Sequence, residues 1–362
     1  MIRKRKALDK LVTYQPGKSI AAVKTKSTRH QILKLASNEN PLGCPIKAND
    51  LTKVCQQAHH YPDQSTHGLI PQLARFWGLD KTQVVLGNGS DDLMQLLALA
   101  YLEPGCEVIT SRHTFSMYAH NTHVMGATYR EVPMKEWYYD LDGILAQIKP
   151  ETKMIFIANP NNPTGTYLDP STIQAFLAKV RPDILVILDE AYGEFVTQER
   201  QSQPAPLLSE FPNVVILRTF SKAYGLAGFR VGYGLASPEV AAHLEQVRQP
   251  FNVNVFSLTA ASMALKMSDF LERSVALVQG QRPAIIEKIR SRGLTCLDSE
   301  ANFICLFLDR PADELDAYLL SQGLIIRHLK SFGLDHGIRV TISTPEDMAI
   351  FDHHLDVFLS QS

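Results

Sequence analysis

Residues 153–192 read KMIFIANPNNPTGTYLDPSTIQAFLAKVRPDILVILDEAY, and this stretch decides the fold. It contains two apolar runs, at 153–158 and 184–188, that are continuous rather than alternating, as expected for strands buried on both faces. Between them, Asp169 and Pro170 predict a helix that continues to Val180, with Asp169 as N-cap and proline at the first helical position. The stretch therefore predicts a strand–helix–strand unit of a parallel sheet.

Similar apolar runs on either side extend this sheet. Runs at 107–110 and 214–217 also have the character of buried strands. Together they predict an α/β fold, with a large domain whose mostly parallel sheet is covered by helices on both faces. In such sheets ligands bind beyond the carboxyl ends of the strands. The residues that follow each run are therefore the first candidates for chemistry.

The pattern changes after about residue 255. Two helical stretches, at 257–278 and 282–292, precede three short strand-like runs at 302–308, 324–327 and 338–342. This order of elements is typical of a smaller α+β domain.

The length also favours more than one domain, because 362 residues exceed the size at which a single core keeps growing. We expect an N-terminal arm that packs with the small domain, a large domain, and a C-terminal small domain, at residues 1–44, 45–254 and 255–362.

The composition is that of an ordinary folded protein, with 45% apolar and 20% charged residues and a formal net charge of -1. Such a charge gives no general attraction to nucleic acid or to anionic membranes, so neither is an expected partner. The five cysteines include no C-x-x-C pair, which indicates free thiols in a reducing compartment. The basic start is not followed by the apolar segment of a signal peptide, and no aliphatic run could span a bilayer, so we expect a cytoplasmic protein.

The segment RTFSKAYGLAGFR at 218–230 places a lysine just beyond a predicted strand. Lys222 has small and aromatic neighbours, which disfavour the ammonium form and favour a nucleophilic amine able to form a Schiff base. Thr219, Ser221 and Arg230 add two hydroxyls and a guanidinium, a set that suits a phosphate dianion. The alternative, a surface lysine on a Ser/Gly loop, accounts poorly for the spacing to the arginine.

The segment DEAY at 189–192 follows the buried run 184–188. A carboxylate at the end of a buried strand needs a cation. A protonated pyridine nitrogen would be one, and Asp189 would keep that ring electron-withdrawing, while Tyr192 could reach the ring's phenolic oxygen. The alternatives are a helix cap or a metal site with Glu190, although no histidine or further carboxylate has the spacing to complete a metal site.

Two loops carry groups that bind oxygen atoms. NPNNPTG, at 159–165, is made rigid by two prolines and a glycine, and its asparagines can donate hydrogen bonds. LGNGSDDL, at 86–93, is a glycine-rich turn before a helical pattern, where free backbone N–H groups would hold a phosphate. It lacks a full G-x-G-x-x-G, which argues against a nicotinamide enzyme. Each loop taken alone is also compatible with an ordinary turn.

Together these four segments resemble the fold-type I pyridoxal-phosphate aminotransferases, in which N-P-N-N-P-T-G, D-E-A-Y and S-K-A-Y-G-L-A-G-F-R occur in this order. The resemblance covers nearly the whole chain. Within that group the chain is most similar to the histidinol-phosphate aminotransferases, through YQPGK at 14–18, LASNENPLG at 35–43 and YPD at 61–63. The resemblance implies transamination between histidinol phosphate and 2-oxoglutarate in histidine biosynthesis, which gives imidazole-acetol phosphate and glutamate.

The resemblance also implies a role for each matching residue. Lys222 would attach pyridoxal 5′-phosphate and move the proton between substrate and cofactor, and Asp189 would pair with the pyridinium nitrogen. Tyr118 would stack on the ring, and Tyr192 and Asn162 would hydrogen-bond its oxygen. The cofactor phosphate would be held by Ser90, Asp91, Thr219, Ser221, Arg230 and, from the neighbouring subunit of a homodimer, Tyr61.

Arg327 and Arg339 would bind the anionic end of the substrate, which is a phosphate in one half-reaction and a glutamate carboxylate in the other. Guanidinium groups suit both anions. The alternative for both is an arginine solvated on the outer face of a strand. Tyr14, on the N-terminal arm, would close over the substrate.

Three other functions remain open from the sequence. An aromatic amino-acid aminotransferase would use the same site with phenylalanine or tyrosine. A threonine-phosphate decarboxylase-like lyase would hold a phosphate on the same arginines while a carboxylate leaves in place of a proton. A non-enzymatic ligand-sensing domain on this fold is disfavoured, because every position of catalytic type is filled.

Overall fold

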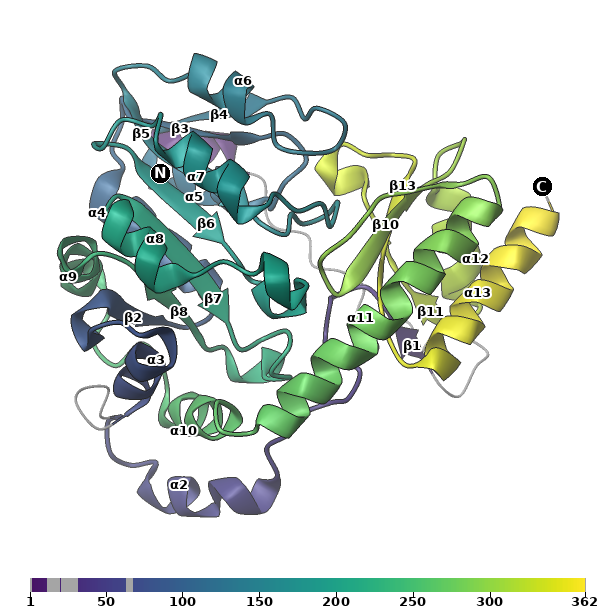
Figure 1. Ribbon diagram of the computed structural model, residues 1–362, viewed down its shortest axis with the longest axis horizontal. Helices are drawn as coiled ribbons and strands as arrows, with labels where there is room; N and C mark the ends of the chain where they lie inside the picture. Colours follow the sequence, from purple (N-terminus) through teal and green to yellow (C-terminus); the bar gives the residue numbers. More distant parts are fainter. Residues whose placement is uncertain (1, 12–19, 21–31, 63–67, 362) are drawn as a thin grey trace.

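The computed structural model describes residues 2–11, 20, 32–62 and 68–361, which form two units with separate hydrophobic cores (Figure 1). The large unit is built around a seven-stranded sheet with the order β2-β8-β7-β6-β5-β3-β4. Its strands are β2 (Val84–Gly87), β3 (Glu107–Ser111), β4 (Thr128–Val132), β5 (Thr152–Ala158), β6 (Leu185–Asp189), β7 (Val214–Thr219) and β8 (Gly232–Leu235).

This sheet is mostly parallel, as predicted. Strands β7, β6, β5, β3 and β4 pair in parallel, whereas β8 runs antiparallel to both of its neighbours. The predicted strands agree with the observed ones to within one or two residues at each end. The carboxyl ends of β5, β6 and β7 consequently meet at one edge of the sheet.

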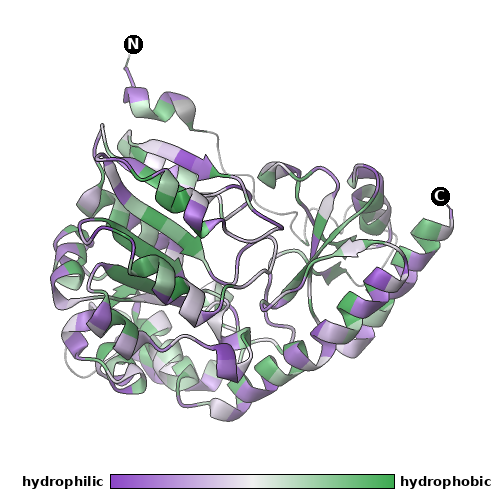
Figure 2. Cartoon of the chain, turned by 45° about the horizontal axis from the view of Figure 1, so that its top comes forward, coloured by the Kyte–Doolittle hydropathy of each residue, from purple (hydrophilic) through white to green (hydrophobic). Residues whose placement is uncertain are grey.

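Both faces of the sheet are buried, which explains its continuous apolar runs. In β5, Met154 and Phe156 pack into the core on one face, and Ile155 and Ile157 pack into the core on the other. The strands accordingly form hydrophobic bands between helices that carry polar residues outward (Figure 2). One face is covered by α4 (Ser90–Tyr101), α5 (Met117–Met125) and α9 (Pro238–Val247), and the other by α3 (Leu69–Trp77), α6 (Leu141–Ala146), α7 (Pro170–Leu177), α8 (Pro204–Glu210) and α10 (Val255–Ala264).

The small unit contains an antiparallel sheet with the order β12-β13-β10-β9 and its own helices (Figure 1). A chain segment near the N-terminus joins it, because β1 pairs in parallel with β11. The elements are β1 (Leu33–Lys34), β9 (Thr295–Cys296), β10 (Phe303–Phe307), β11 (Leu324–Ile325), β12 (Arg327–His328), β13 (Gly337–Thr341), α11 (Ser268–Ser291), α12 (Asp313–Ser321) and α13 (Pro345–Ser360).

The remaining helices are short. Helix α2 (Thr52–Gln57) lies beside α10. The 3₁₀ helices are η1 (Lys6–Lys10), η2 (Ala48–Leu51), η3 (Lys81–Gln83), η4 (Gly193–Phe195), η5 (Gln198–Arg200), η6 (Ala227–Phe229) and η7 (Lys330–Phe332). Within the described ranges, no helix combines the length and the apolar character needed to cross a membrane.

Two helix predictions are wrong in detail. The break predicted between 278 and 282 is absent, because α11 continues through Pro283 and the chain instead breaks between α10 and α11. Tertiary hydrogen bonds hold α11 beside the proline: Gln279 Nε2 donates to the Phe195 carbonyl at 3.2 Å and Arg282 Nη1 donates to the Ala301 carbonyl at 3.1 Å. Helix α7 ends at Leu177 rather than at residue 180, where the chain tightens into 3₁₀-type turns.

Helix α10 packs with the large unit. Its residues Leu258 and Ala261 are buried in the core on one face of the seven-stranded sheet, although they lie beyond the boundary expected at residue 254. The domain boundaries themselves remain predictions.

Candidate active site

A cavity of about 240 Å³ opens at the carboxyl ends of β5, β6 and β7, between the large and the small unit. Most residues singled out in the sequence line it, and they come from segments far apart in the chain. Those residues are Ser90, Asp91, Asn162, Asp189, Tyr192, Thr219, Ser221, Lys222, Arg230, Arg327 and Arg339.

Lys222 lies three residues beyond the end of β7, and its Nζ donates a hydrogen bond to the Ser37 carbonyl at 3.1 Å. Burial and, after it, the positive charge of Arg339 lower the pKa of the Lys222 amine to about 8. Asn40 Nδ2 donates to the Ala223 carbonyl at 2.9 Å and so fixes the turn that carries the lysine. The result is an amine with a substantial neutral fraction near pH 8, which is what nucleophilic attack requires.

Asp189 is the last residue of β6, and its side chain is almost fully buried. The pKa of the Asp189 carboxyl is raised to about 6, chiefly by burial, and the Tyr118 hydroxyl, which donates to Oδ2 at 2.7 Å, opposes this rise. The negative charges of Asp91 and Glu190 raise this pKa as well. A cation that binds in the cavity would therefore strongly stabilise the ionised form of Asp189.

Tyr118 does not occupy the position expected for a stacking ring. Its side chain is fully buried in the first turn of α5, it does not line the cavity, and it stacks on Phe156 with ring centroids 4.5 Å apart. Phe115, in the loop before α5, lines the cavity instead. Two aromatic residues flank the start of this helix, and the sequence alone did not show which of them faces the ligand.

A cradle for an anion lies at the N-terminus of α4. Arg230 Nη1 donates to Ser221 Oγ at 3.2 Å, and Thr219 Oγ1 donates to the same oxygen at 3.0 Å. Gly89 precedes the helix with φ of 90°, and a Cβ there would overlap the Arg230 guanidinium. Only glycine therefore permits both the backbone and this close approach. Free N–H groups at the start of the helix, two hydroxyls and a guanidinium make a site for a phosphate.

The two arginines of the small unit lie opposite each other. Arg327 on β12 and Arg339 on β13 are register partners, so their side chains project from the same face of the sheet into the cavity. Arg339 is buried, donates to the Ala36 carbonyl at 2.8 Å, and also donates to Asn162 Oδ1. Two like charges in this arrangement favour a bound anion.

Tyr192 and Asn38 form a pair in the wall of the cavity. Asn38 Nδ2 donates to the Tyr192 hydroxyl at 2.9 Å, and the Asn38 backbone has φ of 55°. Burial raises the pKa of the Tyr192 hydroxyl, while the charge of Arg339 opposes that rise. The sequence reading did not assign Asn38, Ser37 or Phe115 to the site. Ser37 and Asn38 lie in the motif LASNENPLG at 35–43, but nothing in that motif indicates that these two residues line the cavity.

Two further sequence candidates lie elsewhere in the structure, and a third cannot be placed because it is not among the described residues. Tyr61 is 81% exposed and stacks on Phe251, with ring centroids 4.6 Å apart, outside the cavity. Tyr14 lies outside the described residues. Glu190 does not line the cavity, because it pairs with Arg218 at 2.9 Å. In the part of the chain that the structure describes, no group of three or more His, Cys, Asp or Glu residues is arranged to hold a metal ion.

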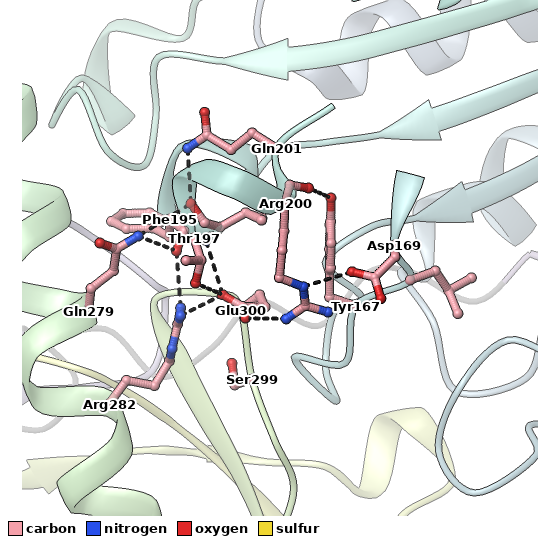
Figure 3. Close-up of polar contacts among 12 residues, drawn as sticks. Tyr167, Asp169, Phe195, Thr197, Arg200, Gln201, Gln279, Arg282, Ser299 and Glu300 are labelled. Atoms are coloured by element: carbon pink, nitrogen blue, oxygen red, sulfur yellow. Dashed lines mark hydrogen bonds and ion pairs between the residues drawn. The ribbon is translucent and has the colours of Figure 1, made fainter. Parts of the chain in front are cut away.

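A network of charges ties the small unit to loops of the large unit (Figure 3). The mostly buried Glu300 accepts hydrogen bonds from Arg282 in α11 and from Arg200 in η5, both at 2.6 Å. The backbone N–H of Glu300 also donates to the Gly165 carbonyl at 2.9 Å, in the loop that carries Asn162. This node holds the Asn162 loop against the small unit.

Comparison with known proteins gives consistent matches over most of the chain. Residues 30–355 match the sequence model of the family described as aminotransferase class I and II. The chain is 41% identical over 344 residues to histidinol-phosphate aminotransferase of Bacillus velezensis, covering 94% of this chain and 96% of that protein. It is 40% identical over 349 residues to histidinol-phosphate aminotransferase 2 of Nitrosospira multiformis, covering 96% and 89%.

A solved structure has the same architecture. The crystal structure of histidinol-phosphate aminotransferase from Sinorhizobium meliloti in complex with pyridoxal-5′-phosphate superposes with a TM-score of 0.90 at 27% identity, and the match covers 100% of this chain and 99% of that chain.

Proposed function

The chain belongs to the class I and II aminotransferases, and from that membership we propose that it transfers an amino group between histidinol phosphate and 2-oxoglutarate with pyridoxal 5′-phosphate as cofactor. The observation that carries this proposal is the arrangement of Lys222, Arg327 and Arg339 around one cavity. It combines an amine of lowered pKa with two guanidinium groups that suit an anionic substrate. The relatives named above act on the same substrate according to their names.

The residues of the cavity fit the proposed cofactor. Asp189 is a buried carboxylate of raised pKa that a pyridinium nitrogen would stabilise, and Gly89 leaves the space in which Arg230 closes an anion cradle. When bound, the cofactor supplies a protonated ring that accepts electron density from the substrate. Asp189 would hold the proton on the ring nitrogen, and Tyr192 and Asn162 would donate to the ring oxygen.

Lys222 is the proposed point of attachment and the base of the reaction. Its neutral amine would form the covalent bond to the cofactor and, after the substrate amine displaces it, would move the proton from the substrate's α-carbon. The cofactor phosphate would be held by Ser90, Asp91, Thr219, Ser221 and Arg230. Phe115, which lines the cavity, would be the aromatic side chain at the cofactor in place of Tyr118.

Arg327 and Arg339 would bind the anionic group of each substrate in turn. The phosphate of histidinol phosphate and a carboxylate of glutamate both suit a pair of guanidinium forks. Tyr14 would close over the substrate.

A homodimer in the cytoplasm is the proposed assembly. Tyr61 is exposed and stacked on Phe251 at the surface. In the homodimer its hydroxyl would bind the cofactor phosphate in the site of the second copy of the chain. The domain division at residues 44 and 254 is part of the same proposal.

Half-reactions of the cofactor-loaded protein test this function. Histidinol phosphate, L-phenylalanine and L-threonine phosphate would each be added alone, with the cofactor absorbance and the release of carbon dioxide recorded. We expect histidinol phosphate to convert the cofactor to its amino form without carbon dioxide. Conversion by phenylalanine alone would contradict the proposed substrate, and carbon dioxide from threonine phosphate would show a lyase.

A further inference from the structure

His113 lies at the border of the two units, next to the cavity but not among the residues that line it. It follows β3, and its backbone has φ of 55°, a region in which histidine, asparagine and aspartate are the enriched non-glycine residues. Its carbonyl oxygen accepts a hydrogen bond from Asn161 Nδ2 at 3.1 Å. The loop that carries Asn162 therefore fixes the backbone of His113.

The side chain of His113 reaches across the border to η7 of the small unit. The distance between His113 Nδ1 and the Phe332 carbonyl oxygen is 2.6 Å. A carbonyl oxygen only accepts hydrogen bonds, so Nδ1 carries the proton and donates it. Gly333 follows directly, and a Cβ there would lie 3.6 Å from the imidazole, in ordinary contact. The His113 side chain of the large unit thus holds the backbone of η7.

Helix η7 in turn contacts the guanidinium of Arg327. Arg327 Nη2 donates to Ser331 Oγ at 3.2 Å, and its Cζ lies 5.9 Å from the centre of the Phe332 ring. Both Arg327 and Phe332 line the cavity. The His113 hydrogen bond consequently acts on the segment that orients this arginine.

We propose that His113 is a positioning residue for substrate recognition, which holds η7 so that the Arg327 guanidinium points at the anionic group of the substrate. The inference deepens the proposed function, because it takes Arg327 as the group that binds this anion. The border is also held by the stacking of Trp137 on Phe307, with ring centroids 4.6 Å apart. Loss of the imidazole should therefore release η7 without separating the two units.

Two substitutions separate the hydrogen bond from the backbone conformation. His113→Gly removes the donor and tolerates positive φ without strain. His113→Asn also tolerates this conformation and keeps an N–H donor near the place of Nδ1. With histidinol phosphate and the loaded enzyme, we expect His113→Gly to raise KM roughly fivefold, the effect of losing one hydrogen bond, with kcat nearly unchanged. His113→Asn should restore most of the affinity, and His120→Asn in α5 should leave KM unchanged.

A double-mutant cycle with Arg327→Gln decides whether His113 acts through the arginine. In the Arg327→Gln background, His113→Gly should cause little further increase in KM. The same increase in both backgrounds, or no rescue by a folded His113→Asn variant, would overturn the inference. The cycle is repeated for the binding of inorganic phosphate to the loaded protein by calorimetry. That readout needs no turnover, so a protein that rejects histidinol phosphate would refute the proposed function while still testing His113.

Discussion

Asp189→Asn should stabilise the cofactor-free protein and lower its affinity for the cofactor. The carboxyl of Asp189 is buried at the end of β6, where its pKa of about 6 exceeds the ordinary value of 3.8. Because the folded chain holds the proton more tightly than the unfolded chain, ionisation of this group destabilises the fold. The cost is absent well below pH 3.8, grows as the pH rises and is complete above pH 6.

The magnitude follows from the two pKa values. Their difference corresponds to about 3 kcal/mol at pH 8 and to about 1.5 kcal/mol at pH 5, where the folded protein is still largely protonated. Asparagine has the same shape and stays neutral, so the substitution removes this cost. With cofactor bound, the same substitution loses a charge-assisted hydrogen bond of about 1.5–3 kcal/mol to the ring nitrogen. Cofactor affinity should fall between roughly tenfold and a hundredfold.

Urea unfolding of the cofactor-free protein at pH 5 and pH 8 measures the first effect, and equilibrium dialysis of pyridoxal phosphate measures the second. Asp189→Asn should exceed the parent protein in free energy of unfolding, by a larger margin at pH 8 than at pH 5. A cofactor-free variant that is equally or less stable at pH 8 would refute the account of Asp189 as a carboxylate kept for a cation.

Further predictions concern three other groups. Since the pKa of Lys222 is lowered to about 8, the rate at which the cofactor-free protein combines with pyridoxal phosphate should rise through pH 8 and level off above pH 9. Stopped-flow absorbance measures this rate, and a rate that is flat from pH 7 to 9 would contradict the prediction. Tyr118→Phe removes the hydrogen bond that lowers the pKa of Asp189, so cofactor affinity in dialysis should fall several-fold, whereas no change would mean that this hydroxyl does not support the carboxylate. Glu300→Ala leaves two arginines without their shared partner and should lower the free energy of unfolding, measured in urea, by about 3 kcal/mol. The exposed control Asp298→Ala should lower it by less than about 1 kcal/mol, and equal losses would contradict the role of Glu300 as a mostly buried ion-pair partner of both arginines.

Much of the fold was predictable because local pattern and tertiary burial agree. The stretch 153–192 contains continuous apolar runs at 154–158 and 184–188, a helix with its N-terminal signal, and turn residues between them. Helix α11 shows where this agreement ends. Gly280 and Pro283 locally favour a break, but hydrogen bonds from Gln279 and Arg282 to the Phe195 carbonyl of the large unit keep the helix continuous. Those hydrogen bonds join residues more than eighty positions apart, and no local pattern records them.

The candidate site divides in the same way. Asp189 and Lys222 were predictable because a parallel sheet brings consecutive strand ends together. Phe115 was missed because the choice between it and Tyr118 depends on where α5 begins, and helix boundaries are set by capping and packing rather than by the motif. His113 carries no signal in the sequence, since its partner is a backbone carbonyl 219 residues away.

Reduction of the cofactor-loaded protein with borohydride, followed by peptide mapping, tests the central claim most directly. The account predicts that the pyridoxyl group is found on Lys222, in the peptide that contains residues 218–230. A pyridoxyl group on any other lysine, with Lys222 unmodified, would contradict it.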